Sequence, residues 1–371
     1  MSAPIRVGIV GVNAQRGWAA EAHIPALRSL PSYEITALSS TRQDSADAAA
    51  AAFGVKLAFS NHHDLVTSPE VDLVVVTVKV AHHREIVDAA LNAGKSVYSE
   101  WPLGLDIDEV QAMVGLAQQK KARTLVGLQS RSNPAVMYAS ELVAEGYVGT
   151  VLSTTLIGSA GLGGIIDQGN SYIVKKENGA SLLRLVAAHS IDVLNHVLGD
   201  FSELSAVLDT RRPDMVVLET GDRIVKTAPD QVAVIGRLES GTTASLHFRE
   251  GHQGGEMFLW EINGTEGTLQ LRAEGGHPGM FAPTISGSQG SDRLTALTIP
   301  ERFTDQTPGL ELLVNTTAYS VARMYDTFAA DLREGSRNAP DFAEALRTFR
   351  VIDAVENAAI SGARVFLPKA I

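Results

Sequence analysis

The chain of 371 residues contains no cysteine. This absence excludes disulfide bonds and metal sites built from thiolates, and it suits a reducing compartment. Basic residues are also too few to balance the acidic ones, so the formal net charge is −11 at pH 7. Because nucleic acids attract basic surfaces, this charge and the absence of a basic run argue against a nucleic-acid partner.

Long apolar runs are absent as well. None approaches the roughly 20 residues that a membrane-spanning helix needs, and the segment 1–6 lacks the basic start and apolar stretch of a signal peptide. We therefore expect a cytoplasmic protein without a membrane partner. Its 45% hydrophobic and 20% charged residues are the usual mixture for a globular chain, and its length favours two domains.

Short apolar segments alternate with helical patterns along the first 130 residues. The apolar segments predict buried parallel strands at 5–10, 34–38, 57–59, 72–78, 96–98 and 123–128. The stretches between them predict helices at 18–30, 45–53, 83–92 and 107–120. This alternation favours an α/β fold with a doubly wound parallel sheet of the Rossmann type, which we place at residues 1–130.

The composition changes after Gln129. A helix is predicted near 131–150, and later segments bounded by turn residues predict strands at 151–157, 204–208, 232–238, 243–249, 257–263 and 268–271. Residues 272–308 are expected to be loops, and two helices are predicted at 310–332 and 342–361. We expect an α+β domain over residues 131–371, with a large, mostly antiparallel sheet and a last helix that can pack back on the first domain.

A glycine-containing turn joins the first predicted strand to the first helix. The places where a dinucleotide-binding turn usually carries glycine hold Gly11, Asn13 and Arg16, and Gly17 and Trp18 follow. Asparagine tolerates left-handed backbone angles, so the turn can still form. Because N–H groups at a helix start bind pyrophosphate, we predict a nicotinamide dinucleotide here. The alternative is a strand–helix turn without a ligand, which the position in the alternating series disfavours.

The end of the second predicted strand bears on the choice of cofactor. An NAD site usually carries an acidic residue there to hold the ribose hydroxyls. This chain has Ser39, Ser40 and Thr41, followed by Arg42. An arginine can pair with a 2′-phosphate, so we expect NADP to be accepted, with NAD as the alternative. The competing interpretation of Arg42 is a surface residue at a helix start.

Three further segments carry a family resemblance. They are the stretches 77–85 and 178–192 and, most specific of the three, the run 90–103, which reads ALNAGKSVYSEWPL. On these residues the chain resembles the glucose–fructose oxidoreductase/inositol dehydrogenase (Gfo/Idh/MocA) family, from residue 5 to the last helix. Within the family, it resembles most the branch of the fungal galactose-pathway repressor, with which it shares Glu100-Trp101 where the wider family has Glu-Lys.

The turn chemistry and the resemblance together imply a set of cofactor-binding residues. These are Gly11, Asn13, Arg16, Gly17, Trp18, Ser40, Arg42, Thr77, Val78, Lys79, His83, Glu100, Trp101 and Gln129. In the family, Glu100 and Trp101 would flank the nicotinamide ribose, and His83 would cap the helix after the fourth strand. Arg131 would line the same crevice as Gln129.

Hydride transfer from a sugar hydroxyl requires a base that takes the hydroxyl proton. In the family, a lysine and an Asp–His pair do this work, and the matching positions here hold Trp101, Leu185 and His189. Only His189 can titrate, and an unperturbed histidine has a pKa of about 6.5. We therefore predict His189 as the catalytic base, with Lys176 and Tyr172 in reserve. Lys175 and Lys79 are further reserve candidates.

Each of these candidates also has a purely structural interpretation. His189 lies on an apolar helix and can be a core histidine, and Lys176 can be a solvated charge. Tyr172 can serve packing alone, and Asp192, one helical turn after His189, can serve structure by orienting that ring or a backbone group.

Two pairs of adjacent histidines, 62–63 and 82–83, raise the question of a metal site. Adjacent side chains on a helix do not face one another, and the spacing typical of zinc peptidases is absent. We therefore expect no metal site.

Three functions remain in view. The first is an NAD(P)-dependent oxidoreductase that transfers a hydride between the nicotinamide and a sugar, polyol or related cyclic alcohol. The second is a non-catalytic dinucleotide-binding sensor, which the repressor branch suggests. A lyase or glycosidase that uses transient oxidation, as some family members do, is a third. We also expect a homo-oligomer, a dimer or a tetramer, formed through the sheet of the second domain.

Overall fold

The computed structural model describes residues 3–161, 163–251, 254–304 and 307–369. The chain divides into two compact units, Met1–Gln129 with Asp305–Leu346 and Ser130–Thr304 with Arg347–Ile371. The first division falls beside the expected boundary at residue 130, but the segment 305–346 groups with the first unit instead of the second. None of the described helices is both long and apolar enough to span a membrane.

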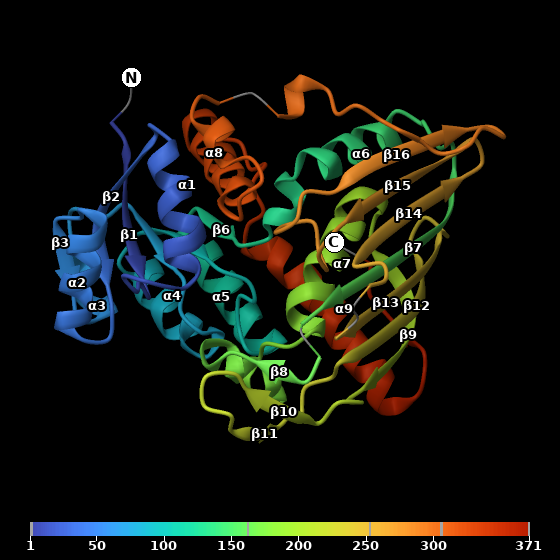
Figure 1. Cartoon of the computed structure of the whole chain (residues 1–371). Helices are drawn as coiled ribbons and strands as arrows, with labels where there is room; N and C mark the ends of the chain where they lie inside the picture. The colour runs from blue at the N-terminus through green and yellow to red at the C-terminus, as the bar shows by residue number, and fades with distance from the viewer. Residues whose placement is uncertain (1–2, 162, 252–253, 305–306, 370–371) are drawn as a thin grey trace. The chain divides into compact units, whose positions relative to one another are not determined.

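The first unit is built on a six-stranded parallel sheet (Figure 1), with the strand order β3-β2-β1-β4-β5-β6. Its strands are β1 (Ile5–Val10), β2 (Tyr33–Ser39), β3 (Leu57–Phe59), β4 (Leu73–Val76), β5 (Ser96–Ser99) and β6 (Thr124–Val126). All four residues of β4 are buried and apolar, as expected of a parallel strand covered by helices on both faces. The predicted doubly wound sheet is confirmed, since this strand order is the one that Rossmann folds share.

The helices of the first unit either connect these strands or belong to the segment 305–346. They are α1 (Ile24–Ser29), α2 (Gln43–Phe53), α3 (His62–Thr67), α4 (His83–Asn92), α5 (Ile107–Lys120) and α8 (Ala318–Glu334), with the short turns η1 (Ala19–His23), η2 (Val80–His82) and η8 (Leu310–Leu313). The predicted helix at 18–30 therefore begins as the π-helical turn η1. Helix α3 was not predicted, because six residues are too few to show a period. Its local signal is Asn61, whose side chain accepts a hydrogen bond from the Asp64 N–H and caps the helix.

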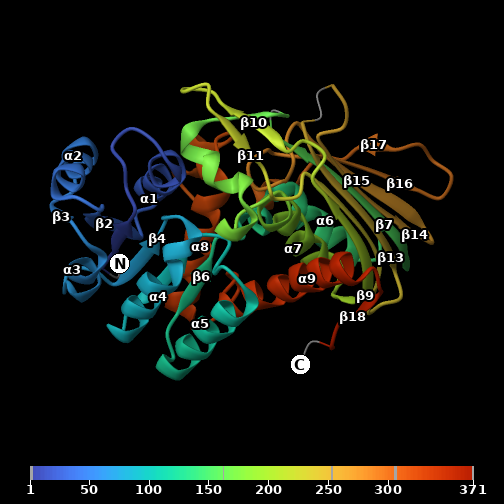
Figure 2. The ribbon, with the colours of Figure 1, turned by 90° about the horizontal axis from the view of Figure 1, so that it is seen from below.

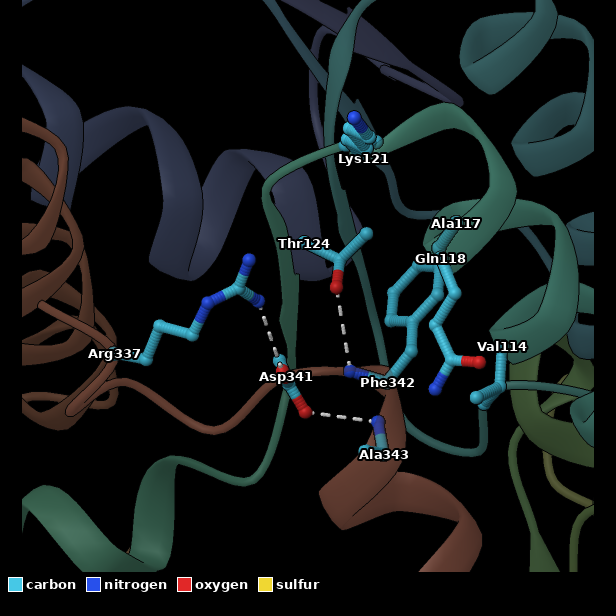
Figure 3. Close-up of a pocket in the computed structure, with 10 residues that line it drawn as sticks. Val114, Ala117, Gln118, Lys121, Thr124, Arg337, Asp341, Phe342 and Ala343 are labelled. Carbon is cyan, nitrogen blue, oxygen red and sulfur yellow. Dashed lines mark hydrogen bonds and ion pairs between the residues drawn. The ribbon is translucent and has the colours of Figure 1, made fainter. Parts of the chain in front are cut away.

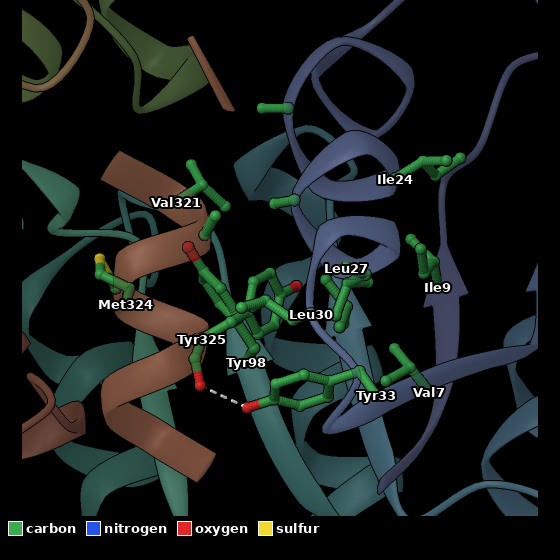
Figure 4. Close-up of a cluster of buried hydrophobic side chains, with 14 of the residues drawn as sticks. Val7, Ile9, Ile24, Leu27, Leu30, Tyr33, Tyr98, Val321, Met324 and Tyr325 are labelled. Carbon is green, nitrogen blue, oxygen red and sulfur yellow. Dashed lines mark hydrogen bonds between the residues drawn. The ribbon is translucent and has the colours of Figure 1, made fainter. Parts of the chain in front are cut away.

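The segment 305–346 belongs to the first unit because α8 packs on its core. Val321, Tyr325 and Phe328 are buried at the i, i+4 and i+7 spacing of one helix face. In Figure 4 this face lies against Leu27 and Tyr33, and the Tyr33 hydroxyl donates to the carbonyl oxygen of Tyr325 at 2.6 Å. A single cut in the sequence cannot represent a segment that returns to an earlier unit, so the expected boundary missed it.

The end of this returning segment is tied to α5 and β6, around a cavity of 380 Å³ (Figure 3). The Phe342 N–H donates to Oγ1 of Thr124 at 3.4 Å, and Oδ1 of Asp341 accepts from the Ala343 N–H at 2.8 Å. Asp341 thereby caps the start of α9 (Phe342–Ser361). The residues that line this cavity include none of the predicted site residues. We therefore do not count this cavity as part of the candidate functional site.

The second unit carries a nine-stranded sheet with the order β17-β16-β15-β14-β7-β13-β12-β9-β18. Its strands are β7 (Val151–Ala160), β9 (Phe201–Asp209), β12 (Gln231–Leu238), β13 (Thr243–Glu250), β14 (Phe258–Gly264), β15 (Gly267–Ala273), β16 (Thr284–Gln289), β17 (Thr295–Ala296) and β18 (Val365–Phe366). Only the pair β7–β13 is parallel among the pairings described. The predicted mostly antiparallel sheet is confirmed.

The expectation of loops at 272–308 was wrong for β16 and β17, because alternating serine and glycine in β16 hide its strand pattern. Helices α6 (Pro134–Ala144), α7 (Ala188–Leu198) and α9 lie on the same side of the large sheet (Figure 2). The remaining elements are the strands β8 (Ile165–Ile166), β10 (Asp214–Val217) and β11 (Arg223–Val225) of a small sheet and the turns η3 (Gln129–Ser132), η4 (Gln168–Val174), η5 (Lys176–Asn178), η6 (Leu183–Ala187) and η7 (Glu301–Phe303).

Candidate functional site: a dinucleotide cradle and a histidine pair

The turn after β1 packs closely against the neighbouring strand ends. Gly11 has a φ of 98°, and a Cβ atom placed on it would lie 2.6 Å from Cγ1 of Val78. Neither the backbone angle nor the available space suits any other residue. The N–H groups of Gly11 and Val12 donate to the carbonyl oxygen of Ser39 at 3.0 and 3.2 Å, so the turn is fixed against the end of β2.

The rest of the turn stays accessible. Oδ1 of Asn13 accepts a hydrogen bond from the Gln15 N–H at 2.9 Å, which closes an Asx turn. Gly17 has a φ of 95° and open space where a Cβ would stand. Asn13 and Arg16 are exposed, and Trp18 is half-buried before η1. The broken glycine pattern therefore still forms a turn with an exposed cation beside it.

A cavity of 500 Å³ opens beside this turn, at the carboxyl ends of β1 and β2 and past the end of β4. Open α/β sheets bind ligands at this edge. Its lining includes Gly11, Asn13, Ser40, His62 and Glu85. The residues present fit the adenosine half of a dinucleotide, since they combine a glycine that admits close approach with hydroxyl and ionisable groups.

Among the described residues, Arg42 lies outside this lining. Its Nη2 donates to Oγ of Ser45 at 3.4 Å, along the exposed start of α2. The ionisable side chains that line the cavity are instead His62, His82 and Glu85. Sequence reasoning had not assigned these three to the cofactor, because they lie on α3, η2 and α4, respectively, and outside the glycine turn.

The loop after β4 is held from behind by a buried histidine. Thr77 Oγ1 donates to the last carbonyl group of β1 at 2.9 Å. His83 is 1% exposed, with Nε2 at 2.9 Å from the carbonyl oxygen of Val78 and Nδ1 at 3.3 Å from Oγ of Ser99. Burial lowers the pKa of His83, so the ring is neutral and its Nε2–H donates to Val78. His83 therefore supports the loop, while Lys79 is exposed.

Glu100, at the end of β5, begins a buried chain of polar groups that sequence reasoning missed. Its Oε1 lies 2.8 Å from Nε2 of His23, and Nδ1 of His23 lies 2.7 Å from the Tyr325 hydroxyl. Burial raises the pKa of Tyr325, so the phenol keeps its proton and donates to Nδ1, and Nε2–H donates to Glu100. Gly127 makes room for the carboxyl group, because a Cβ there would lie 2.6 Å from Oε2.

Trp101 and Gln129 are both buried near the carboxyl edge of the sheet. Trp101 is 6% exposed and precedes Pro102 through a cis peptide bond. Gln129 is 3% exposed, and its Oε1 has no hydrogen-bond partner among the described residues. An unpaired buried amide oxygen costs about 1–3 kcal/mol, which makes Gln129 a candidate acceptor for a ligand.

In the second unit, Arg131 and Asp192 bind one another. Nε and Nη2 of Arg131 donate to Oδ2 and Oδ1 of Asp192 at 2.7 and 2.6 Å. The Thr348 hydroxyl donates to the same carboxylate at 3.0 Å, and the Asp192 side chain is 0% exposed. The contacts of this carboxylate are thus with Arg131 and Thr348, which gives Asp192 a structural role.

His189, on α7, is paired with a second histidine. Its ring stacks on His277 with centroids 4.6 Å apart and planes within 7°. Burial lowers the pKa of His189 to about 4 and that of His277 well below its usual value. The Gly279 N–H donates to Nδ1 of His277 at 3.2 Å. Both rings are neutral at pH 7, and sequence reasoning missed His277 because it lies in an irregular, glycine-rich stretch.

The reserve candidates lie on the turns that precede α7. Burial raises the pKa of Tyr172, on η4. Lys176, on η5, has an exposed side chain and a backbone N–H that donates to Oγ1 of Thr227 at 3.0 Å. Leu185 lies in the π-helical turn η6. Because it is a leucine, the position that holds the family's aspartate carries no acid here.

The first two residues of α3 depart from the expected geometry. The rings of His62 and His63 have centroids 4.0 Å apart, although adjacent helical side chains were expected to point apart. The difference arises at the helix start, where no preceding turn restricts the side chains. Nε2 of His62 also lies 3.7 Å from Oε1 of Glu85, and burial lowers the pKa of His62.

Two models of known protein families match successive parts of the chain. A family model described as "Oxidoreductase family, NAD-binding Rossmann fold" matches residues 5–128. A second, described as "Gal80p, C-terminal domain", matches residues 134–273.

The relatives include both regulators and enzymes. The galactose/lactose metabolism regulatory protein GAL80 of Saccharomyces cerevisiae is 30% identical over 296 residues, which cover 74% of this chain and 68% of that protein. Dehydrogenase aclE of Aspergillus oryzae is 31% identical over 284 residues, which cover 73% of this chain and 77% of that protein.

Solved structures share the fold over nearly the whole chain. A super-repressor mutant of S. cerevisiae Gal80p matches with a TM-score of 0.87 and 25% identity over 98% of both chains. A levoglucosan dehydrogenase in complex with NADH and L-sorbose matches with a TM-score of 0.83 and 22% identity, over 98% of this chain and 99% of that one. The turn at Gly11 and the cavity beside it form the dinucleotide cradle. The sequence identities and the two domain matches, together with this cradle, show that the chain belongs to the Gfo/Idh/MocA oxidoreductase family, in the branch whose C-terminal domain is of the Gal80p type.

Proposed function

We propose that the protein is an NAD(P)-dependent oxidoreductase that transfers a hydride between the nicotinamide and a sugar, polyol or related cyclic alcohol. The observation that carries this proposal is the cradle at Gly11, a turn with a left-handed backbone angle and no side chain that lines a cavity of 500 Å³. A bound nicotinamide would accept or supply the hydride, and the chain's own residues would orient the reactants and move the proton. Relatives named as dehydrogenases support this choice.

The cavity supports binding of both NAD and NADP. Ser39, Ser40 and Thr41 line its β2 side, where hydroxyl groups bind a ribose without repelling a 2′-phosphate. Arg42 is exposed next to them, and its Nη2 makes a long, 3.4 Å contact to Ser45, so it can turn towards such a phosphate. Titration of the chain with NADH and with NADPH, followed by nucleotide fluorescence, tests this expectation, and a clear preference for NADH would contradict the role of Arg42.

His189 is the proposed base. Its low pKa keeps the imidazole unprotonated at pH 7, as a base requires, although a base of pKa about 4 accepts a proton less readily than one near neutrality. Lys176 and Tyr172 remain the reserve candidates. We expect His189→Ala to lose turnover and to keep its affinity for NADH, because the cradle lies in the first unit. Unchanged turnover would move the role to Tyr172 or Lys176.

A non-catalytic dinucleotide sensor is the second candidate function. It is favoured by the positions where the family carries lysine and aspartate, which hold Trp101 and Leu185, and by the similarity to a regulatory protein. A sensor would bind NADH in the cradle and form no reduced product with any sugar or polyol. An enzyme would reduce NAD or NADP with at least one compound of such a panel.

We further propose a homo-oligomer formed through the large sheet of the second unit. Val207 and Ile235 are 65% and 59% exposed on β9 and β12. Val207 pairs with Ala233, two residues before Ile235, so both side chains lie on one face of the sheet. Exposed apolar side chains on a sheet face favour association. Sedimentation of wild type and Ile235→Lys tests this, since the charge should shift the protein towards monomers.

A further inference from the structure

Three side chains at the dinucleotide cavity bring nitrogen and oxygen donors together. His62 and His63 open α3, and Glu85 lies in the first turn of α4. One donor atom from each lies within 4.8 Å of the others. His62 and Glu85 also line the 500 Å³ cavity, so the cluster lies at the place expected for the cofactor's adenosine half.

The spacing within this cluster suits an ion better than a hydrogen bond. Nε2 of His62 and Oε1 of Glu85 are 3.7 Å apart, beyond the 2.7–3.2 Å of a hydrogen bond. Two ligands on one tetrahedral zinc, each at about 2.0–2.1 Å, are separated by about 3.4 Å. Nε2 of His62 is buried and has no hydrogen-bond partner among the described residues. An ion between the two side chains would satisfy this nitrogen.

The cluster combines one fixed ligand with two adjustable ones. The His62 side chain is 15% exposed, and Asn61 anchors its helix turn through Oδ1, which accepts from the Asp64 N–H at 2.9 Å. His63 is exposed, and the Glu85 side chain is 65% exposed, so both can move by the small amount that coordination requires. Two imidazoles and one carboxylate form a donor set that suits Zn²⁺ and other divalent first-row ions.

We propose that His62, His63 and Glu85 form a binding site for a divalent transition-metal ion, in the first place Zn²⁺. Three protein ligands leave a fourth tetrahedral position for water or for a ligand in the cavity. A bound ion therefore lies next to the site of the dinucleotide, and we expect it to change the affinity for NADH. Coordination by two adjacent histidines is the arrangement that sequence reasoning had excluded, and the 4.0 Å contact between the rings removes that objection.

The test is calorimetric titration of the full chain with Zn²⁺ after treatment with a chelator, in the absence of any dinucleotide. We expect one ion per chain with a dissociation constant in the low micromolar range. His62→Gln should weaken this binding about tenfold or more, since it removes a direct ligand, and Glu85→Gln should weaken it less. His82→Gln is the matched control, because His82 lines the same cavity outside the cluster. This variant should bind Zn²⁺ with the affinity of the wild-type chain.

The absence of Zn²⁺ binding, its retention in His62→Gln or an equal loss in His82→Gln would each overturn the proposal. Unfolding midpoints of the variants exclude a loss that merely reflects misfolding. A separate titration with NADH, with and without Zn²⁺, keeps this proposal distinct from the proposed function. Binding of Zn²⁺ without any binding of a dinucleotide would contradict the proposed function alone. Binding of NADH without any binding of Zn²⁺ would contradict the proposed metal site alone.

Discussion

The dinucleotide cavity of the first unit and the His189 site of the second differ in how far their polar side chains are open to a ligand. In the first, Asn13 is exposed and the buried nitrogen of His62 has no hydrogen-bond partner among the described residues. In the second, Arg131 and Asp192 neutralise one another, and burial holds the pKa of His189 at about 4. On the proposed function, dinucleotide binding would depend on groups that a ligand can reach, whereas proton transfer would depend on one weakly basic imidazole. Binding and chemistry can therefore be lost separately.

The largest effect is expected from the buried ion pair of the second unit. Arg131→Met would leave the fully buried Asp192 carboxylate without its cation and beside the Thr348 hydroxyl, and breaking such a pair costs about 3–5 kcal/mol. Denaturant unfolding measures this loss. The matched control is Arg211→Met, because the Arg211–Asp209 pair is exposed and should contribute less than about 1 kcal/mol. Equal effects in the two variants would show that burial adds nothing to the contribution of the Arg131–Asp192 pair.

The next effect concerns the protonation of His189. Its pKa in the folded chain is about 4, and about 6.5 is expected in the unfolded chain. Because the unfolded state binds the proton first, this stabilisation is complete above pH 6.5 and is lost as the pH falls towards 4. The loss for this group amounts to about 3 kcal/mol. Comparing the pH dependence of unfolding in wild type and His189→Phe isolates it.

Two readouts test this assignment of His189 directly. The ring signal should titrate near pH 4 in an NMR experiment, and the acid limb of kcat/KM should lie near the same pH. A midpoint near 6.5 would show that the ring is accessible to water and would erase its difference from an ordinary surface histidine.

A smaller effect is expected in the cradle of the first unit. Gly11→Ala places a methyl group 2.6 Å from Val78 in a left-handed conformation, so the turn has to move. Because the moved turn no longer fits the dinucleotide, we expect NADH affinity to fall about tenfold or more. The control is Gly115→Ala in α5, where a Cβ has open space and NADH affinity should not change. An unchanged affinity in Gly11→Ala would place the dinucleotide elsewhere.

The smallest effect is expected at Arg42. Arg42→Ala removes an exposed cation beside Ser40, and exposed ion pairs contribute little, so NADPH affinity should fall about two- to fivefold. The affinity for NADH should stay the same, because the ribose hydroxyl carries no charge. Parallel titrations with the two nucleotides measure this, and an equal fall for both would assign Arg42 to the shape of the α2 start instead.

Sequence patterns predicted the sheets well because the order of apolar and polar residues in a strand indicates which of its faces are buried. The wholly apolar run of β4 indicates burial on both faces, and the alternation in β12 indicates burial on one. The place of α8 was not predictable in the same way. Its pattern shows which face is buried, but the core that receives Tyr325 lies far away in the sequence.

The candidate site was predictable only where it depends on the backbone. Gly11 after an apolar strand indicates a turn, and its backbone angle and close packing suit no other residue. The stacking of His189 on His277 joins two distant segments, and the contact between His62 and His63 depends on side-chain rotamers at a helix start. Neither leaves a periodic signal in the sequence, so both required the structure.

The most direct test of the central claim is the absorbance of reduced cofactor after the chain is mixed with NAD or NADP and a panel of sugars, polyols and sugar acids. NADH binding to the same preparation is confirmed first by fluorescence titration. The proposed oxidoreductase predicts a rise with at least one compound, and that rise should vanish in His189→Ala. A flat trace across the panel from a chain that binds NADH would contradict the enzyme and favour a dinucleotide sensor.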